Sequence, residues 1–69
     1  MKLSARNQLK GKIAKVTKGS TTAHVMVELA GGHTIMSSIT NEAVDELALK
    51  AGDEAIVVIK ASDVMIAKE

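Results

Sequence analysis

Apolar and polar residues alternate through the first part of the chain, which predicts strands, and the period lengthens after residue 40, which predicts a helix. A first strand is predicted over residues 7–17, where Leu9, Ile13 and Val16 are apolar. The alternation slips by one residue between Ile13 and Val16. This slip predicts a β-bulge at Gly11 or in the neighbouring lysine-rich stretch.

Two more strands are predicted on either side of a glycine pair. Residues 23–29, "AHVMVEL", have apolar residues at every second position, so they form a strand of period two. Gly31 and Gly32 suit a two-residue hairpin turn, because glycine accepts positive φ freely. A third strand then runs over residues 33–39, and the loop before the second strand is "KGSTT", residues 18–22.

A short helix is predicted within "TNEAVDELALKAG". Thr40 is a suitable N-cap, and Glu42 lies in the first turn, where the helix dipole favours a carboxylate. Gly52 is placed to end the helix in the left-handed conformation. The apolar side chains of one helical face are expected to be Val44, Leu47 and Ala48.

The end of the sequence predicts two further strands. "EAIVVIKAS" is apolar at consecutive positions, which predicts a strand buried on both faces, and "DVMIAKE" predicts a short last strand. Five strands with a helix between the third and fourth are typical of an all-β, OB-like small barrel. Another small barrel or an α+β sandwich is the alternative. The whole chain, residues 1–69, is expected to be one domain.

The composition indicates a chain that needs partners for stability. A 69-residue domain is marginal alone, and the chain has no Cys and no aromatic residue, although 46% of its residues are hydrophobic. Disulfides are therefore excluded. A structural zinc site is disfavoured because the chain has only two His residues and no Cys to supply thiolates. Oligomerisation is the remaining route to stability.

Charge and hydropathy disfavour nucleic acid and membranes as partners. The net charge is +1, and an OB-type nucleic-acid binder normally stacks bases on aromatic rings in a basic groove. No apolar run approaches the roughly 20 residues of a membrane span. "MKLSARNQ" lacks the apolar core of a signal peptide, and the absence of Cys is compatible with the cytosol.

The residues suggest no catalytic centre. Glu42, Asp45 and Glu46 are interpreted as the solvated face of the helix, and His24 as a surface or interface residue. The four Met residues are interpreted as core or interface residues. No phosphate-binding loop or cluster of metal-ligating residues is present, so we expect no enzyme and no bare-cation site.

Donors of hydrogen bonds gather near the two ends of the sequence. Ser4 and Arg6 precede the first strand, and Lys60 and Ser62 follow the fourth. Thr40 stands where the helix begins, and helix N-termini offer backbone N–H groups to anions. Each of these residues has an ordinary structural explanation when taken alone, but together they suggest an anion site.

Several segments resemble the molbindin family, also called the Mop or molybdate/tungstate-binding TOBE domain. The resemblance begins with "SARNQLKGKI", residues 4–13, and continues through "TTAHVMVEL" and "SSIT". It extends over "LALKAGDEAIVVIKASDVMIA", residues 47–67, so it covers nearly the whole chain. Relatives with two tandem domains often have "KAP" or "KAT" where this chain has "KAS".

The resemblance implies a homohexamer, a trimer of dimers, that binds molybdate or tungstate at subunit interfaces, with further sites near the threefold axis. Matching motifs imply the oxyanion-binding residues Ser4, Arg6, Thr40, Lys60, Ala61 and Ser62. Ala61 has only its backbone N–H to offer, and Arg6 has both a guanidinium and an N–H. For the axial sites the loop of residues 19–23 is the candidate.

The chemistry of these donors suits a tetrahedral oxyanion, whose oxygens accept hydrogen bonds from hydroxyl, N–H and cationic groups. We therefore predict a cytoplasmic protein that stores molybdate, and tungstate with it, without catalysis. The alternatives are an oxyanion-responsive regulatory or adaptor module, an OB-type nucleic-acid binder, and a pterin-binding protein. The absence of aromatic rings argues against the last of these.

Overall fold

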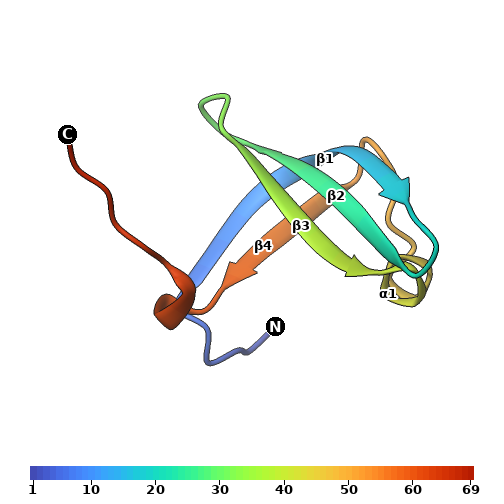
Figure 1. Cartoon of the computed structure of the whole chain (residues 1–69), viewed down its shortest axis with the longest axis horizontal. Helices are drawn as coiled ribbons and strands as arrows, with labels where there is room; N and C mark the ends of the chain where they lie inside the picture. Colours follow the sequence, from blue (N-terminus) through green and yellow to red (C-terminus); the bar gives the residue numbers. More distant parts are fainter.

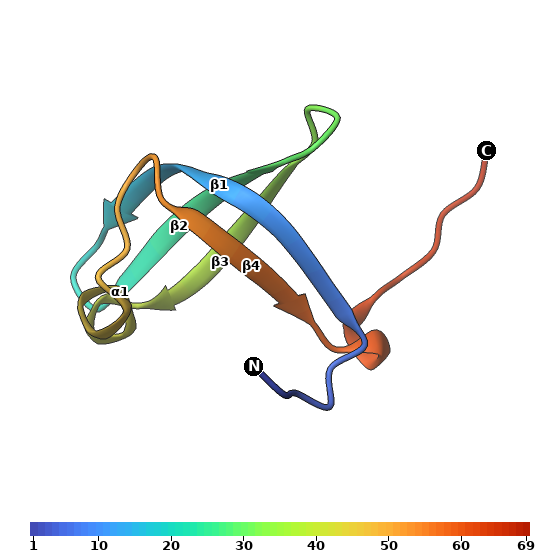
Figure 2. The ribbon, with the colours of Figure 1, turned by 180° about the vertical axis from the view of Figure 1, so that it is seen from behind.

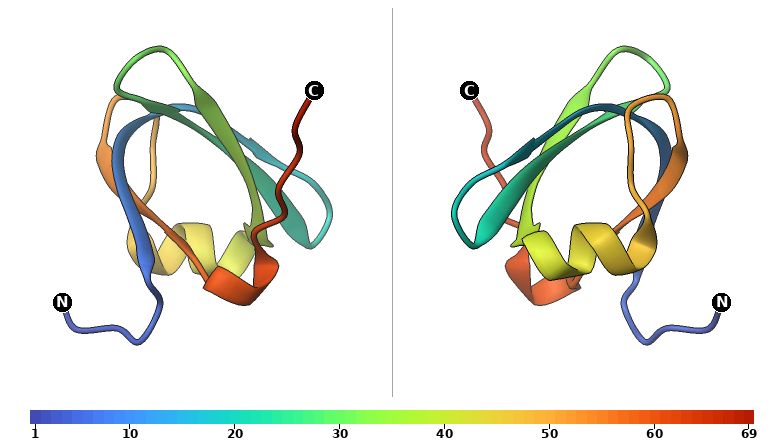
Figure 3. Two further views of the ribbon diagram at one scale, coloured as in Figure 1. Left: turned by 90° about the vertical axis from the view of Figure 1, so that its left-hand side faces the viewer. Right: turned by 90° about the vertical axis from the view of Figure 1, so that its right-hand side faces the viewer.

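The computed structural model describes residues 1–69 and consists of one curled antiparallel sheet with a short helix at one end (Figure 1). The strand order is β3-β2-β1-β4, and the curl gives the sheet the shape of a half-barrel (Figure 3). The elements in chain order are β1 (Asn7–Lys18), β2 (Thr22–Leu29), β3 (Thr34–Thr40), α1 (Asn41–Leu47), β4 (Glu54–Ile59) and the 3₁₀ turn η1 (Ala61–Asp63).

Strand β1 contains the predicted bulge, in the lysine-rich stretch. Ile13 pairs with Val27, whereas Lys15, and not Ala14, pairs with the preceding residue of β2. The extra residue shifts the alternation, so Ile13 and Val16 both face the core despite their odd spacing. The slip in the sequence pattern is thus a structural feature of the strand.

The hairpin between β2 and β3 has the predicted glycines but a longer loop. Gly31 and Gly32 have φ values of 89° and 88°, which non-glycine residues rarely adopt. The Leu29 N–H donates to the His33 carbonyl at 2.7 Å, so Ala30 joins the two glycines in the loop. The predicted two-residue turn is therefore wrong by one residue.

Helix α1 begins as predicted and ends earlier. The Thr40 hydroxyl caps the helix by accepting a hydrogen bond from the Ala43 N–H at 3.0 Å. The C-cap is Ala48, with φ 51°, and not Gly52. Gly52 lies in the turn before β4, where its φ is 93° and its N–H donates to the Ile13 carbonyl at 2.8 Å.

The early end of α1 also changes its apolar face. Val44 is buried, whereas the Leu47 side chain is 66% exposed and Ala48 is exposed. The left-handed turn at Ala48 redirects the chain, and Leu49 packs against the core instead. Of the three residues predicted for this face, one occupies it.

The core of the single chain is small. Its five buried side chains come from the inner face of the sheet and from α1: Ile13, Ala23, Val25, Val27 and Val44. Gly11 allows β1 and β2 to approach closely, because a Cβ there would lie 2.6 Å from the Glu28 carbonyl oxygen. So few buried side chains supply little hydrophobic stabilisation to a 69-residue fold.

Strand β4 is covered on one face only, contrary to the prediction. Ala55 and Val57 pack against the core, while Ile56 and Val58 on the other face are 44% and 42% exposed. β4 is an edge strand of this sheet, and its extensive contacts are with β1. The sequence of β4 has the apolar pattern of a strand buried on both faces, but the single chain buries only one face of this strand.

The predicted fifth strand does not form within the chain. After η1, residues 64–69 have no sheet partner and run away from the sheet (Figures 1 and 2). Met65 and Ile66 are 92% and 89% exposed. The mostly β, OB-like fold with one helix between the third and fourth strands is as predicted, with four strands in place of five.

Candidate functional site

The two ends of the sequence meet at one end of the sheet. Asn7 pairs with Ile59 across β1 and β4, and the Asn7 Nδ2 also donates to the Ile59 carbonyl at 3.2 Å. Continuing that register by one residue places Arg6 opposite Lys60. The start of β1 and the turn after β4, which carry the "SARN" and "KAS" segments, therefore lie at the same end of the sheet (Figure 2), although the two termini run apart from there.

The two cations at this end have no acidic partner. The one ion pair of the chain joins Lys18 to Asp45, and it includes neither Arg6 nor Lys60. Like charges opposite each other on neighbouring strands repel. An anion between the two side chains would relieve that repulsion, so this end of the sheet is suited to a negative ligand.

The turn after β4 adds backbone donors beside these cations. The Lys60 carbonyl accepts a hydrogen bond from the Asp63 N–H at 2.9 Å, which closes η1. The N–H groups of Ala61 and Ser62 have no acceptor within the chain. Ser4 is exposed and makes no side-chain hydrogen bond. Five of the six predicted residues thus lie at one end, with free donors.

Thr40, the sixth predicted residue, lies at the opposite end of the sheet. It pairs with Thr22 where β3 ends and β2 begins, next to α1 (Figure 1). Its hydroxyl oxygen accepts the capping bond from Ala43, which leaves the O–H free to donate. One chain therefore does not bring Thr40 together with the other five residues.

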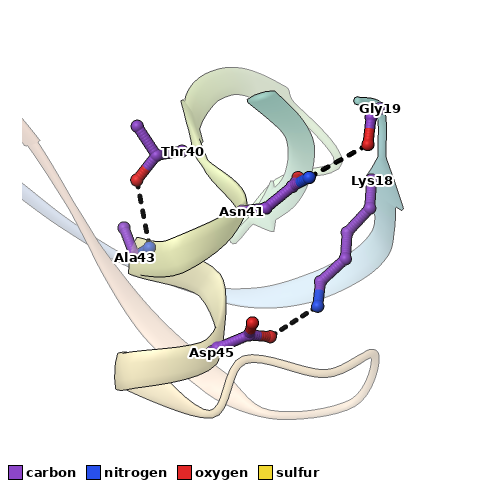
Figure 4. Close-up of polar contacts among 6 residues, drawn as sticks. All are labelled: Lys18, Gly19, Thr40, Asn41, Ala43 and Asp45. Carbon is purple, nitrogen blue, oxygen red and sulfur yellow. Dashed lines mark hydrogen bonds and ion pairs between the residues drawn. The ribbon is translucent and has the colours of Figure 1, made fainter. Parts of the chain in front are cut away.

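Hydrogen bonds fix the loop of residues 19–23 to the start of α1 (Figure 4). The Asn41 Nδ2 donates to the Gly19 carbonyl at 2.9 Å, and the Asn41 N–H donates to the Thr21 carbonyl at the same distance. The Lys18 ammonium binds Asp45, one of the helix carboxylates expected only to be solvated. The loop predicted for the axial sites therefore lies beside Thr40, at the same end.

Two grooves of the single chain do not coincide with the predicted residues. A groove of about 640 Å³ lies over Gly11 and Leu29, and another of about 610 Å³ lies between Val16 and Val44. Neither is lined by any of the six residues. No group of three or more His, Cys, Asp or Glu side chains gathers anywhere in the chain, and no helix has the length and apolarity to span a bilayer.

The sequence interpretation missed a positioning role for Asn7. Its half-buried side chain ties β1 to the end of β4 and so sets where Arg6 and Lys60 lie. The signal was its place in "SARN", directly before the first strand. The free N–H groups of η1 could not be predicted, because the sequence suggested a strand there.

Comparison with known proteins agrees with this fold. The TOBE domain family matches residues 3–66. Molybdenum-pterin-binding protein 1 of Clostridium pasteurianum is 53% identical over 66 residues, which are 96% of this chain and 97% of that protein. The structure of MopII from the same organism superimposes with a TM-score of 0.91, at 49% identity, and covers 97% of this chain and 100% of that one.

A molybdate-bound structure is also similar. It is that of ModG, described as a cytoplasmic molybdate-binding protein. It superimposes with a TM-score of 0.91 at 48% identity, over 94% of this chain and 46% of ModG. With a family match over almost its full length and relatives at about half identity, this chain belongs to the TOBE domain family, in the group of the Mop proteins.

Proposed function

We propose that this protein binds molybdate, and tungstate with it, as an intracellular store. The observation that carries the proposal is the pair of cations Arg6 and Lys60, which directly precede and follow the paired residues Asn7 and Ile59 and form no ion pair with a carboxylate. The names of the similar proteins, which refer to molybdenum and molybdate, support an oxyanion of this kind as the ligand. Tungstate has the same charge and shape, so the same donors suit it.

The donor set suits a tetrahedral dianion. Each oxyanion oxygen accepts hydrogen bonds, and charge-assisted bonds from Arg or Lys are the strongest of those on offer. We assign binding to the residues that combine these donors: Ser4, Arg6, Thr40, Lys60, Ala61 and Ser62. Hydroxyls and N–H groups complete the cage without a net positive charge large enough to attract every anion.

The separation of Thr40 from the other five residues supports a site shared between two copies. In this arrangement one copy contributes the "SARN" and "KAS" segments, and a second copy contributes Thr40. The small core and the exposed apolar residues Met65 and Ile66 favour an assembly that buries more surface. We propose a homohexamer, a trimer of dimers, with additional axial sites at the loop of residues 19–23.

Each chain, residues 1–69, acts as one Mop domain with a binding role and no catalytic step. The relatives are named as binding proteins, and ModG is described as cytoplasmic, which supports a cytoplasmic location for this protein too. Binding at an interface would also stabilise the assembly, because a ligand that binds only the assembled form shifts the equilibrium toward it.

Equilibrium dialysis against molybdate in excess sulfate tests the function. We expect about one molybdate per chain or slightly more, because each twofold interface repeats the same shared site for both copies and the axial sites are shared among several chains. Bound molybdenum is measured by elemental analysis, and tungstate is measured in parallel. Binding that sulfate abolishes would contradict a selective store, and steeply salt-dependent oligonucleotide binding would favour the nucleic-acid alternative.

Mixed assemblies test whether the site is shared. Lys60→Ala and Thr40→Val chains each lack one half of every site, so neither binds molybdate well alone. Co-refolded in equal amounts, they form mixed dimers in half of the cases, and one of the two sites there has both parent halves. We expect recovery of about a quarter of the parent sites. No recovery would contradict a shared site and place all the ligands in one copy.

A further inference from the structure

The outer face of β2 and β3 carries a histidine and two methionines close together. Met26 of β2 lies directly opposite Met36 of β3, and both point to the face away from the core. His24 precedes Met26 by two residues, so it lies on the same face of the same strand. This outer face is remote in the sheet from the end where Arg6 and Lys60 lie.

All three side chains are accessible for binding. Met36 is 56% exposed, Met26 is half-buried, and His24 is exposed. The ring nitrogens of His24 make no hydrogen bond within the chain. Directly opposite residues of an antiparallel pair have Cβ atoms about 4.5–5.5 Å apart, and methionine has three rotatable bonds. Both sulfur atoms can therefore reach a single ion above the strands.

We propose that this face binds a soft monovalent cation, Cu(I), through the Sδ atoms of Met26 and Met36 and a ring nitrogen of His24. Thioether ligands select Cu(I) among the common metals, and imidazole also suits copper. The three ligands are neutral and none is a thiolate or carboxylate, so divalent zinc, calcium and magnesium are poorly matched. One carboxylate, Glu28, lies on this face two residues beyond Met26, where it is opposite Lys12 of β1.

The surroundings of the three ligands favour a low charge on the ion. Lys15 of β1 lies opposite Met26 on the other side, and Thr17 lies opposite His24. Lys15 is exposed and has no ion-pair partner, so its flexible side chain can turn its ammonium into solvent. Its residual repulsion acts more strongly on a divalent ion than on a monovalent one.

Titration of the intact protein with Cu(I), under anaerobic conditions and against a chromophoric Cu(I) chelator, tests this site. We expect Met36→Leu and His24→Gln each to weaken Cu(I) binding about tenfold or more, the scale on which metal-site partners act. Leucine keeps the volume and apolar character of methionine, so the fold and the assembly are retained. The matched controls are Met65→Leu and His33→Gln, which lie outside the site and should bind like the parent.

NMR of protein with ¹³C-labelled methionine methyl groups gives a second measurement. Of the four methionine signals, we expect those of Met26 and Met36 to shift on addition of Ag(I), and those of Met1 and Met65 to remain in place. The proposal is overturned if the protein fails to compete with the chelator, if Met36→Leu binds as tightly as the parent, or if Zn(II) binds as well as Cu(I). Any of these results would leave the two methionines as packing residues.

Discussion

The two ends of the sheet differ in how far their polar groups find partners within the chain. At the α1 end, Lys18 binds Asp45, Asn41 binds Gly19, and Thr40 caps the helix (Figure 4). At the other end the two cations and the N–H groups of Ala61 and Ser62 are without partners. We call the α1 end, where polar groups are paired within the chain, the finished end. We call the other end, where donors lack acceptors, the unfinished end.

Exposed apolar residues also lie at the end with the free donors, although Leu47 of α1 is exposed as well. The exposed residues Val64, Met65 and Ile66 extend from the end that carries the free donors. In the proposed assembly a second copy would cover these unpartnered apolar and polar groups, with an oxyanion between the two. The predictions below test that contrast, beginning with the largest expected effect.

Replacement of Ile66 by aspartate should disrupt the assembly. The Ile66 side chain is 89% exposed in the single chain, so its replacement should change the stability of that chain little. If it is buried between copies, its burial contributes roughly 1.5–3 kcal/mol for each copy. We expect Ile66→Asp to shift the protein from hexamers to much smaller species in sedimentation equilibrium at micromolar concentration.

Leu47→Asp is the matched control for this change, because Leu47 is also a large, exposed apolar residue but lies at the α1 end. It should leave the assembled mass close to that of the parent. If Leu47→Asp dissociates the protein and Ile66→Asp does not, the apolar residues that hold the copies together are those of α1 and not those of residues 64–66.

Removal of both unpaired cations should nearly abolish molybdate binding without unfolding the protein. A hydrogen bond to a charged group contributes about 1.5–3 kcal/mol, so Lys60→Ala alone should weaken binding roughly 10–100-fold. Arg6→Ala adds to this loss if the guanidinium binds, and adds little if the backbone N–H does. Isothermal titration with molybdate measures both variants and their combination.

Lys50→Ala removes the same charge from the α1 end and serves as the control. Lys50 is exposed and unpaired, so its loss changes the net charge of the protein equally. Binding should stay within about twofold of the parent, since Lys50 is not among the proposed ligand residues and salt screens the field of an exposed charge. Equal losses for Lys50→Ala and Lys60→Ala would mean that overall charge, and not a local site, attracts the anion.

The finished end of the molecule was the more predictable one. Local patterns specify the cap at Thr40, the strand of residues 22–29 and the bulge before Val16, because each depends on neighbours in the sequence. Gly52 misled the prediction of the helix end, since Ala48 takes the left-handed conformation itself and Gly52 serves a later turn. Which residue takes the left-handed conformation at the end of a helix depends on tertiary contacts, which the local sequence does not reveal.

The unfinished end was predicted less well for a different reason. "EAIVVIKAS" and "DVMIA" are as apolar as buried strands, yet Ile56, Val58 and Met65 are exposed in the single chain. In the proposed assembly these residues would be buried between copies, and a sequence pattern does not distinguish contacts within a chain from contacts between chains. The motif resemblance named the donors, and the fold added that Thr40 lies apart from them.

Thr40 should show two separable effects, one on the helix and one on the ligand. Loss of an N-cap hydroxyl costs about 1 kcal/mol, so Thr40→Val should lower the free energy of unfolding without molybdate by that amount. Thr40→Ser keeps the hydroxyl and should retain both stability and molybdate affinity. A Val variant that is less stable but binds molybdate as the parent does would remove Thr40 from the site and leave it a cap.

The ion pair between Lys18 and Asp45 should give the smallest effect. Both side chains are largely exposed, at 46% and 66%, and surface pairs typically contribute about 0.2–1 kcal/mol. A double-mutant cycle with Lys18→Met and Asp45→Asn, followed by urea unfolding, should give a coupling energy in that range that declines at high salt. Molybdate affinity should not change in any of the three variants. A change in affinity would mean that the α1 end takes part in binding through its charges as well as through Thr40. The contrast between the two ends would then describe hydrogen bonding within the chain and not ligand binding.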